Sequence, residues 1–304
     1  MTDRNPEQTI PDRLATSTNI VSFRRDGGKT PMVELIPLLA KTGWKRLDLN
    51  FCEMMNPSSI LCTDRWMSYV DALSELKDRY GLSYIQSHAP YAYDRFALTA
   101  SAGTTSDSLV LRAIEASAIL GVRCAVVHPA KGSDGFDSSR LREMNVRWLS
   151  RFVDLAEKRN VTIALENLDA IGEIREADEL CALVDAIDSP HVGVCYDFGH
   201  AHLGGQDHRA NLLTYGSRLV ATHVADNHGA ADEHLLPFYG TLPWEICMKT
   251  LKEIGYAGFL TYEVMFFTRN LPEALKPSML RHAMDAGRYL CDLMEQDEQA
   301  NDRQ

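Results

Sequence analysis

The chain has 304 residues, of which 45% are hydrophobic and 24% charged, a composition typical of a globular protein with enough apolar side chains for a core. Its net charge is −11 and its isoelectric point about 5.4, which argues against broad nonspecific nucleic-acid binding. No apolar run approaches the ~20 residues of a membrane span, and the first residues contain no apolar signal core. We therefore expect a cytoplasmic protein with no membrane partner.

The cysteines support the same compartment. There are seven of them, with no paired spacing, at positions 52, 62, 124, 181, 195, 247 and 291. An odd, scattered set favours a reducing environment over a disulfide framework.

Short apolar runs recur along the chain, and each is a candidate for a strand buried on both faces. In chain order the expected strands cover residues 19–23, 46–50, 83–88, 123–128, 161–167, 192–197, 219–225 and 259–264. Helical patterns fall between and after them, at residues 32–41, 64–80, 106–120, 139–159, 177–186, 209–215, 243–254 and 272–295. In the second helix Asp64 is a candidate N-cap, and Gly81 is the expected stop.

This alternation predicts the fold class. A strand and its return helix take roughly 30 residues or more, so eight such units predict one α/β domain with the (β/α)8 TIM-barrel fold. We expect a flexible segment at residues 1–18, a TIM-barrel catalytic domain at 19–295 and a flexible tail at 296–304. The loop 226–242, after the seventh strand, is longer than most loops of this type and is therefore expected to be functional.

Metal-binding side chains stand at the ends of strands five to eight, namely Glu166, Asp197, His223 and Glu263. The C-terminal ends of barrel strands meet at one mouth, so residues far apart in the chain converge there. Carboxylates packed together repel one another unless a cation or a shared proton intervenes. Three carboxylates and one imidazole suit Mn²⁺, Co²⁺ or Zn²⁺. The pattern predicts one divalent metal ion at the barrel mouth.

Further polar residues occupy related positions. His88 and His128 end strands three and four, His200 follows strand six, and Asp232 and His234 form a D-x-H pair in the loop 226–242. Each alone is better explained as a hydrogen-bonded residue at a strand end. Together they are candidates for additional metal or substrate binding, and they leave room for up to three ions. The remaining histidines lack this context and are expected in packing or at the surface: His191, His202, His208, His228 and His282.

These residues lie in motifs that resemble those of the xylose isomerase-like TIM-barrel superfamily. The motifs are S-H-A-P-Y (87–91), V-V-H-P (126–129), A-L-E-N (164–167), Y-D-F-G-H (196–200), H-V-A-D-N (223–227) and T-Y-E-V (261–264). The superfamily includes sugar isomerases and epimerases together with AP endonucleases of the endonuclease IV type.

The resemblance implies two ligand sets. In the epimerase branch one divalent ion is held by residues matching Glu166, Asp197, His223 and Glu263, and the residue matching His200 contacts the substrate. In the endonuclease branch three zinc ions use a larger set, which matches His88, His128, Glu166, Asp197, His200, His223, Asp232, His234 and Glu263. The endonuclease branch has Asn-Asp-Ser-Lys after its strand-seven histidine, where this chain has V-A-D-N (224–227). The surrounding sequence therefore resembles the sugar branch more closely.

The leading hypothesis is a metal-dependent isomerase or epimerase that acts on a sugar or sugar phosphate through a metal-stabilised enediolate. Glu166 and Glu263 would remove and return the proton beside the carbonyl. A dehydratase or lyase acting on a keto-sugar or cyclic polyol, a trinuclear-zinc AP endonuclease, and a barrel that only binds a sugar remain alternatives. The partner expected is a small carbohydrate, and a homo-oligomer stays open.

Overall fold

The structure, a computed structural model, describes residues 12–91, 105–132, 137–169 and 173–296. The expected flexible ends fall mostly outside these ranges, because residues 1–11 and 297–304 are not described. None of the described helices is both long and apolar enough to cross a membrane.

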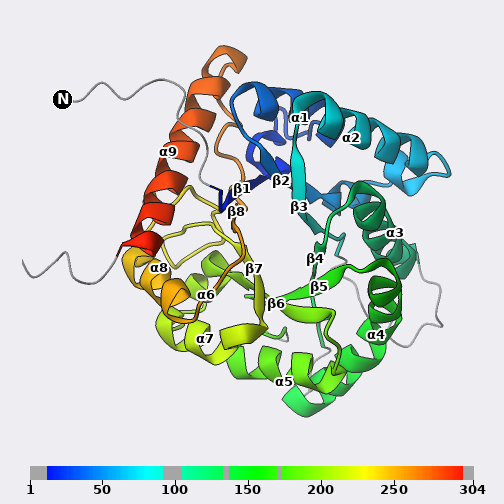
Figure 1. Cartoon of the computed structure of the whole chain (residues 1–304), viewed down its shortest axis with the longest axis vertical. Coiled ribbons are helices and arrows are strands. Elements are labelled where there is room, and N and C mark those ends of the chain that lie inside the picture. Colours follow the sequence, from blue (N-terminus) through cyan, green and yellow to red (C-terminus); the bar gives the residue numbers. More distant parts are fainter. Residues whose placement is uncertain (1–11, 92–104, 133–136, 170–172, 297–304) are drawn as a thin grey trace, which may run out of the picture.

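Eight parallel strands form one sheet that curls into a ring, with the helices around it (Figure 1). The strands are β1 (Leu14–Ser17), β2 (Arg46–Asn50), β3 (Ser83–His88), β4 (Cys124–Val127), β5 (Thr162–Glu166), β6 (Val192–Asp197), β7 (Leu219–His223) and β8 (Leu260–Tyr262). The α-helices are α1 (Met32–Lys41), α2 (Trp66–Tyr80), α3 (Thr105–Leu120), α4 (Ser138–Arg159), α5 (Ala177–Ile187), α6 (Phe198–Leu203), α7 (His208–Tyr215), α8 (Trp244–Glu253) and α9 (Lys276–Glu295). The predicted TIM-barrel α/β fold is confirmed.

The barrel closes between its seventh and eighth strands. The sheet order runs from β7 through β1 to β8, and a parallel bridge joins Val224 to Tyr262 just beyond the end of β7. The Val224 amide donates to the Thr261 carbonyl over 2.8 Å, and the Glu263 amide donates to the Val224 carbonyl over 3.2 Å. This seam holds Glu263 beside the end of β7.

The first strand was predicted in the wrong place. It covers Leu14–Ser17, within the segment expected to be flexible, and it pairs with both β2 and β8. Residues 19–23 contain more apolar side chains, but Thr18–Val21 forms a 3-10 turn, η1, whose Ile20 and Val21 are buried in the core. The prediction followed the more hydrophobic segment, which packs in the core just after the strand, whereas the strand itself is short and half polar.

Two smaller features of the helices also differ from the predictions. Asp64 does not cap α2, because the chain turns at Thr63, whose hydroxyl and carbonyl accept from the amides of Arg65 and Trp66. Gly81 does end this helix, in the left-handed conformation at φ 58°. The short helix α6, directly after β6, was not predicted.

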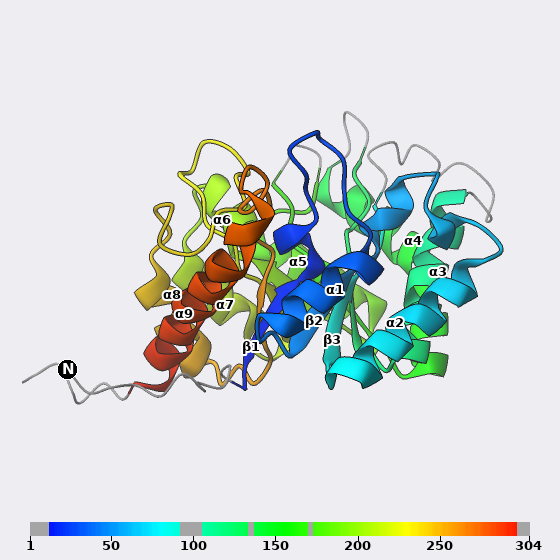
Figure 2. The same cartoon turned by 90° about the horizontal axis from the view of Figure 1, so that it is seen from above.

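Strand alternation decides which side chains lie inside the barrel. Small residues two positions before the barrel-mouth residues form an interior cluster of Val126, Ala164, Cys195 and Ala221. Because side chains on one strand face alternate sides, His128, Glu166, Asp197 and His223 point to the same interior, one layer nearer the mouth. The loops that follow β1 and β7 rise on this end of the barrel (Figure 2).

A buried carboxylate organises the long loop after β7. Asp226 accepts hydrogen bonds from the amides of Asn227, Phe238 and Leu242 and from the indole nitrogen of Trp244, over 2.9–3.1 Å. The side chain is fully buried. The loop is therefore fixed to the start of α8 by a single side chain.

We expect Asp226→Ala to lower the free energy of unfolding by about 3 kcal/mol, because it leaves buried donors without an acceptor. Denaturant unfolding followed by fluorescence measures this. Asp185→Ala, which removes an exposed partner of Arg218, is the control and should change stability little. Equal losses in the two variants would contradict the role given to Asp226.

A second buried polar contact lies behind β6. The imidazole Nδ1 of His208 on α7 lies 2.8 Å from the hydroxyl of Tyr196, and its Nε2 has no partner among the described residues. Burial, with a smaller contribution from His202, lowers the pKa of His208 to about 4. The neutral imidazole is therefore the form that fits the fold.

When folding lowers the pKa of a histidine, the unfolded chain takes up a proton at a higher pH than the folded chain does. The free energy of unfolding therefore falls as the pH falls. Between pH 7 and pH 5 this should cost the wild type about 2 kcal/mol more than a His208→Gln variant. Urea unfolding of both proteins at the two pH values measures the difference. Parallel pH dependences would show that His208 keeps its ordinary pKa.

Candidate metal centre

Four side chains meet at the barrel mouth. Glu166, Asp197 and His223 are the last residues of β5, β6 and β7, and Glu263 directly follows β8. One potential ligand atom from each lies within 4.8 Å of all the others. The strand register explains part of this arrangement, since Asp197 and His223 are direct partners in the β6–β7 ladder.

The imidazole of His223 lies among the three carboxylates. Its Nδ1 is 3.0 Å from Oε1 of Glu166, 3.3 Å from Oε2 of Glu263 and 3.7 Å from Oδ2 of Asp197. All four residues are buried. Burial, together with repulsion from Glu166 and Glu263, raises the pKa of Asp197 to about 7, although His200 and His223 act in the opposite sense.

These residues fit a divalent cation. Within the described chain, Oδ2 of Asp197 and Nε2 of His223 are buried without a hydrogen-bond partner. Three carboxylates gathered out of contact with water are stable as anions only when positive charge lies among them. A mixed oxygen and nitrogen donor set of this kind suits Mn²⁺, Co²⁺ or Zn²⁺.

A second group of potential ligands adjoins the first through Glu166. Oε2 of Glu166 lies 3.2 Å from Nε2 of His88 and 3.0 Å from Nε2 of His128, and these three residues also satisfy the geometry of a metal group. Nδ1 of His88 is 2.8 Å from the carbonyl of Ala89, which can only accept, so Nδ1 carries a proton. A neutral His88 then presents a lone pair to the Glu166 carboxylate, and a proton or a cation must lie between them.

Glu166 is held in its charged form. Burial opposes this, but the neighbouring imidazoles of His223 and His128 lower its pKa well below the ordinary value. In return, the thiol of Cys52 and the Glu166 carboxylate raise the pKa of His88 above its ordinary value despite burial. Glu166 is therefore an anion that can bind a cation or accept a proton.

The remaining candidates form a chain of contacts that adjoins the four central residues, since Nδ1 of His200 lies 3.5 Å from Oε1 of Glu166. Asp232 forms an ion pair with Nε2 of His234 over 2.8 Å, and Nε2 of His200 is 3.7 Å from the same carboxylate oxygen. Nδ1 of His234 lies 3.0 Å from the Glu263 carbonyl. None of these three residues belongs to a metal group found in the described part of the chain. The loop 226–242 thus reaches the mouth of the barrel, where its Asp232 and His234 pair with each other.

Sequence reasoning missed the residue that aligns β5 with β6. The Asn167 side chain donates to the Asp197 carbonyl over 3.0 Å and accepts from the Asp197 amide over 2.8 Å, while its own carbonyl lies 2.9 Å from Nδ1 of His200. The Asp197 carboxylate also accepts from the His200 amide, which caps α6. The A-L-E-N motif contained Asn167, but only the fold shows what it contacts.

Tyr91, the last residue of the S-H-A-P-Y motif, lies beside the second group of potential ligands. Its ring stacks on His128 with centroids 4.4 Å apart and planes 12° apart, and both residues line the pocket. The five other histidines lie outside the metal groups, as exemplified by His228, which pairs with Glu233 at the surface.

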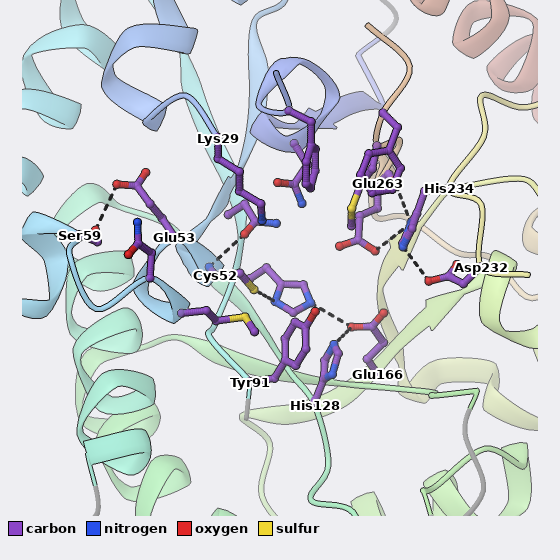
Figure 3. A pocket seen from close by; sticks show the side chains of 18 of the residues that line it. Lys29, Cys52, Glu53, Ser59, Tyr91, His128, Glu166, Asp232, His234 and Glu263 are labelled. Carbon is purple, nitrogen blue, oxygen red and sulfur yellow. Dashed lines mark hydrogen bonds and ion pairs between the residues drawn. The ribbon is translucent and has the colours of Figure 1, made fainter. Parts of the chain in front are cut away.

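A cavity of 1110 Å³ opens above the centre. Glu166 and Glu263 line it, as do His88, His128 and His200, whereas Asp197 and His223 are absent from its lining among the described residues. Figure 3 shows Glu166 with His128 on one side of the view, and Glu263 with His234 on another. The two glutamates are therefore the ligand candidates that a bound molecule can reach.

Two curated proteins illustrate the sequence similarity. The chain is 35% identical over 159 residues to the uncharacterized protein y4fM of Sinorhizobium fredii, a match that spans 51% of each protein. It is 24% identical over 136 residues to the fructoselysine 3-epimerase of Escherichia coli O157:H7, covering 42% of this chain and 50% of that enzyme. The chain thus spans about half the length of these relatives.

Solved structures match over nearly the whole chain. A D-tagatose 3-epimerase-like protein aligns with a TM-score of 0.70 at 22% identity, covering 93% of this chain and 97% of the other. A D-psicose 3-epimerase solved in the presence of D-fructose aligns with a TM-score of 0.71 at 15% identity, covering 93% of this chain and 99% of the other. The IOLI protein with a bound zinc atom aligns with a TM-score of 0.69 at 17% identity, covering 93% of this chain and 98% of the other. These likenesses show the fold. The xylose isomerase-like TIM barrel family matches residues 39–283, most of the barrel including all four residues of the centre, and the chain belongs to that family.

Proposed function

We propose that the protein is a divalent-metal-dependent sugar isomerase or epimerase, which moves a proton at the carbon beside a carbonyl. The observation that carries the proposal is that two of the four central residues are enclosed and the other two also line the cavity. Asp197 and His223 are enclosed beneath the centre, whereas Glu166 and Glu263 also face the cavity. Such a site can hold an ion from below and offer two carboxylates to a substrate above.

The chemistry follows from this placement. A divalent ion bound by Glu166, Asp197, His223 and Glu263 supplies Lewis-acid polarisation of the substrate carbonyl. Epimerisation requires one base to take the proton from one face of the carbon and another acid to return it on the opposite face. Glu166 and Glu263 come from different strands and approach the cavity separately, so they suit these two roles.

Neighbouring side chains orient the substrate. His200 has Nδ1 directed to the Asn167 carbonyl, which fixes the ring and leaves Nε2 facing Asp232 and the cavity. His88 is fixed in the same way by the Ala89 carbonyl. Rings anchored through one nitrogen can present the other to a substrate hydroxyl without losing much conformational freedom on binding.

The relatives favour epimerisation of a ketose over the other reactions of this class. The named relative acts on fructoselysine, and two of the structural neighbours are described as D-tagatose and D-psicose 3-epimerase or similar to one. The neighbour with zinc supports the choice of a divalent ion. An elimination catalysed by the same carboxylates, which would make the protein a dehydratase, is distinguished by its unsaturated product.

A phosphodiesterase acting at abasic DNA is the second candidate. One observation favours it: His88, His128 and Glu166 form a further potential metal group beside the first. Among the described residues, however, six carboxylates line the cavity, and their negative charge opposes the approach of the phosphodiester backbone of DNA. One ion per chain supports sugar chemistry, and three ions support the nuclease.

We expect one divalent ion per chain after dialysis against a buffer without metal, measured by elemental analysis. His223→Ala should weaken binding of that ion by more than about a hundredfold, because loss of a residue that only supports a ligand already costs about 10- to 100-fold. His191→Ala, at the opposite end of β6, is the control and should retain the ion. Full retention of the ion by the His223 variant would contradict the proposed ligand set.

We expect Glu263→Gln to slow proton exchange at the carbon beside the carbonyl by about 10²- to 10⁴-fold, because the amide cannot act as a base. The measurement is deuterium uptake from D2O into D-fructose, D-psicose, D-tagatose and D-sorbose, followed by mass spectrometry. Glu233→Gln, on an exposed loop residue, is the control. Unchanged exchange in the Glu263 variant would reject its role, and no exchange by the wild type on any of these sugars would count against the function.

A further inference from the structure

We infer that the substrate carries a second, uncharged ring beyond the sugar that reaches the metal centre, and that this ring packs on the wall formed by Phe23, Lys29 and Phe266 at the mouth of the cavity. The inference rests on the proposed function and names its substrate class as a ketose that bears a further sugar ring.

The size of the cavity is the first observation. Its 1110 Å³ exceeds the upper end of the range of about 300–1,000 Å³ found for pockets that hold drug-sized ligands. One hexose ring at the metal centre leaves most of this space to water. The lining is continuous from Glu166 and Glu263 to Phe23 and Phe266, so a second ring reaches the outer part without leaving the pocket.

The outer part has an aromatic wall. Phe23 and Phe266 lie with ring centroids 4.4 Å apart and planes inclined by 48°. Phe266 is 44% exposed, and both rings line the cavity. The electron-rich face of an aromatic ring attracts the C–H groups on the flat face of a sugar ring. Two inclined rings therefore make a receptacle for such a face.

Backbone strain marks the same place. Phe266 has φ 58°, in the left-handed region that a bulky side chain rarely adopts. The conformation is held from both sides: the amide of the preceding residue, Met265, donates to the His234 carbonyl, and the Arg269 amide donates to the carbonyl of Phe266. The surrounding backbone therefore holds the exposed Phe266 ring at the edge of the cavity without a ligand.

Phe23 is presented by a short hairpin. An antiparallel bridge pairs it with Lys29, and the amides of Arg24 and Thr30 close the turn by donating to Gly28 and Ser22. The ammonium of Lys29 lies 4.6 Å from the centroid of the Phe23 ring. Figure 3 shows Lys29 on the side of the pocket away from Glu166 and His128, where it can donate to a hydroxyl group. The aromatic wall is thus preorganised and carries one polar donor.

The two loops that form this wall are joined independently of any ligand. The Thr268 hydroxyl, which is buried, donates to the Ile20 carbonyl over 3.1 Å and so ties the loop after β8 to the loop after β1. The wall therefore stands at a fixed position relative to Glu263, which begins the loop after β8.

Charge decides between an uncharged ring and an anionic group. Among the described residues, six carboxylates line the cavity against two lysines, Lys29 and Lys131, and no arginine. A phosphate or carboxylate on the substrate would be repelled over most of the pocket, and it would lack the planar donors that arginine supplies for such groups. A hydroxylated ring meets no such penalty.

Calorimetric binding to the Mn²⁺-loaded protein tests the inference. The probes are D-fructose and three disaccharides in which fructose carries a second hexose at C4, C5 or C6, namely lactulose, leucrose and isomaltulose. We expect at least one disaccharide to bind about tenfold more tightly than D-fructose, the gain that stacking of one further ring provides. If none of the three binds more tightly than D-fructose, or none binds at all, the inference is wrong.

Variants locate the second ring. Phe266→Ala should reduce the ratio of the two affinities toward one, and Phe266→Tyr should restore it. Phe238→Ala is a matched control, because Phe238 is also left-handed, at φ 73°, and 47% exposed, but it lies outside the described lining of the cavity. An unchanged ratio in the Phe266→Ala protein overturns the assignment.

The proposed function fails separately from this inference. Proton exchange on any ketose, together with equal affinity for D-fructose and the disaccharides, would leave the isomerase or epimerase standing and remove only the second ring. Tighter binding of a disaccharide without exchange on any of the sugars would do the reverse.

Discussion

The repulsion among three buried carboxylates is the constraint on which the centre depends. A parallel barrel forces alternate side chains inward, and carboxylate oxygens of Glu166, Asp197 and Glu263 therefore meet within 3.7 Å of one imidazole nitrogen, Nδ1 of His223. No arrangement of neutral neighbours can stabilise that much negative charge out of water. The fold remains favourable only if protons or a cation share the space. Burial, and with it the repulsion from Glu166 and Glu263, raises the pKa of Asp197 to about 7 even though His200 and His223 act in the opposite sense.

The same constraint explains why so much of the surrounding structure consists of polar anchors. Asn167 bonds to both the amide and the carbonyl of Asp197, and Asp226 fixes the loop that brings Asp232 and His234 to the mouth. Each anchor removes freedom from a side chain that would otherwise move away from its neighbours of like charge. The candidate metal site and its anchors therefore form one network, in which the carboxylates repel one another and the hydrogen bonds to the backbone hold them in place.

Much of the barrel and of its candidate site could be predicted from the sequence, because strands buried on both faces have continuous apolar sequences. The bounds of β2, β3 and β6 were predicted to the residue, and the C-terminal ends of the predicted strands five to eight pointed to Glu166, Asp197, His223 and Glu263 as candidates. The β1 strand was not found, because Leu14–Ser17 is half polar and owes its place to pairing on both sides. Phe23 and Phe266 could not be found either, since nearly the whole chain separates them and only the pairing of β1 with β8 brings them together.

Barrel closure also explains how one pocket can serve two recognition tasks. The last strand supplies Glu263 to the metal centre, and the loop that follows it supplies Phe266 to the outer wall, while the loop after the first strand supplies Phe23 and Lys29. Under the proposed function, the acidic end of the pocket would recognise its ligand through a cation, whereas the aromatic outer end would recognise shape. Because the two ends are joined through the parallel pairing of β1 with β8, the distance between them is set by the barrel itself. A molecule that fills both ends is selected by its length and by the flat face of its second ring, and its charge contributes little to that selection.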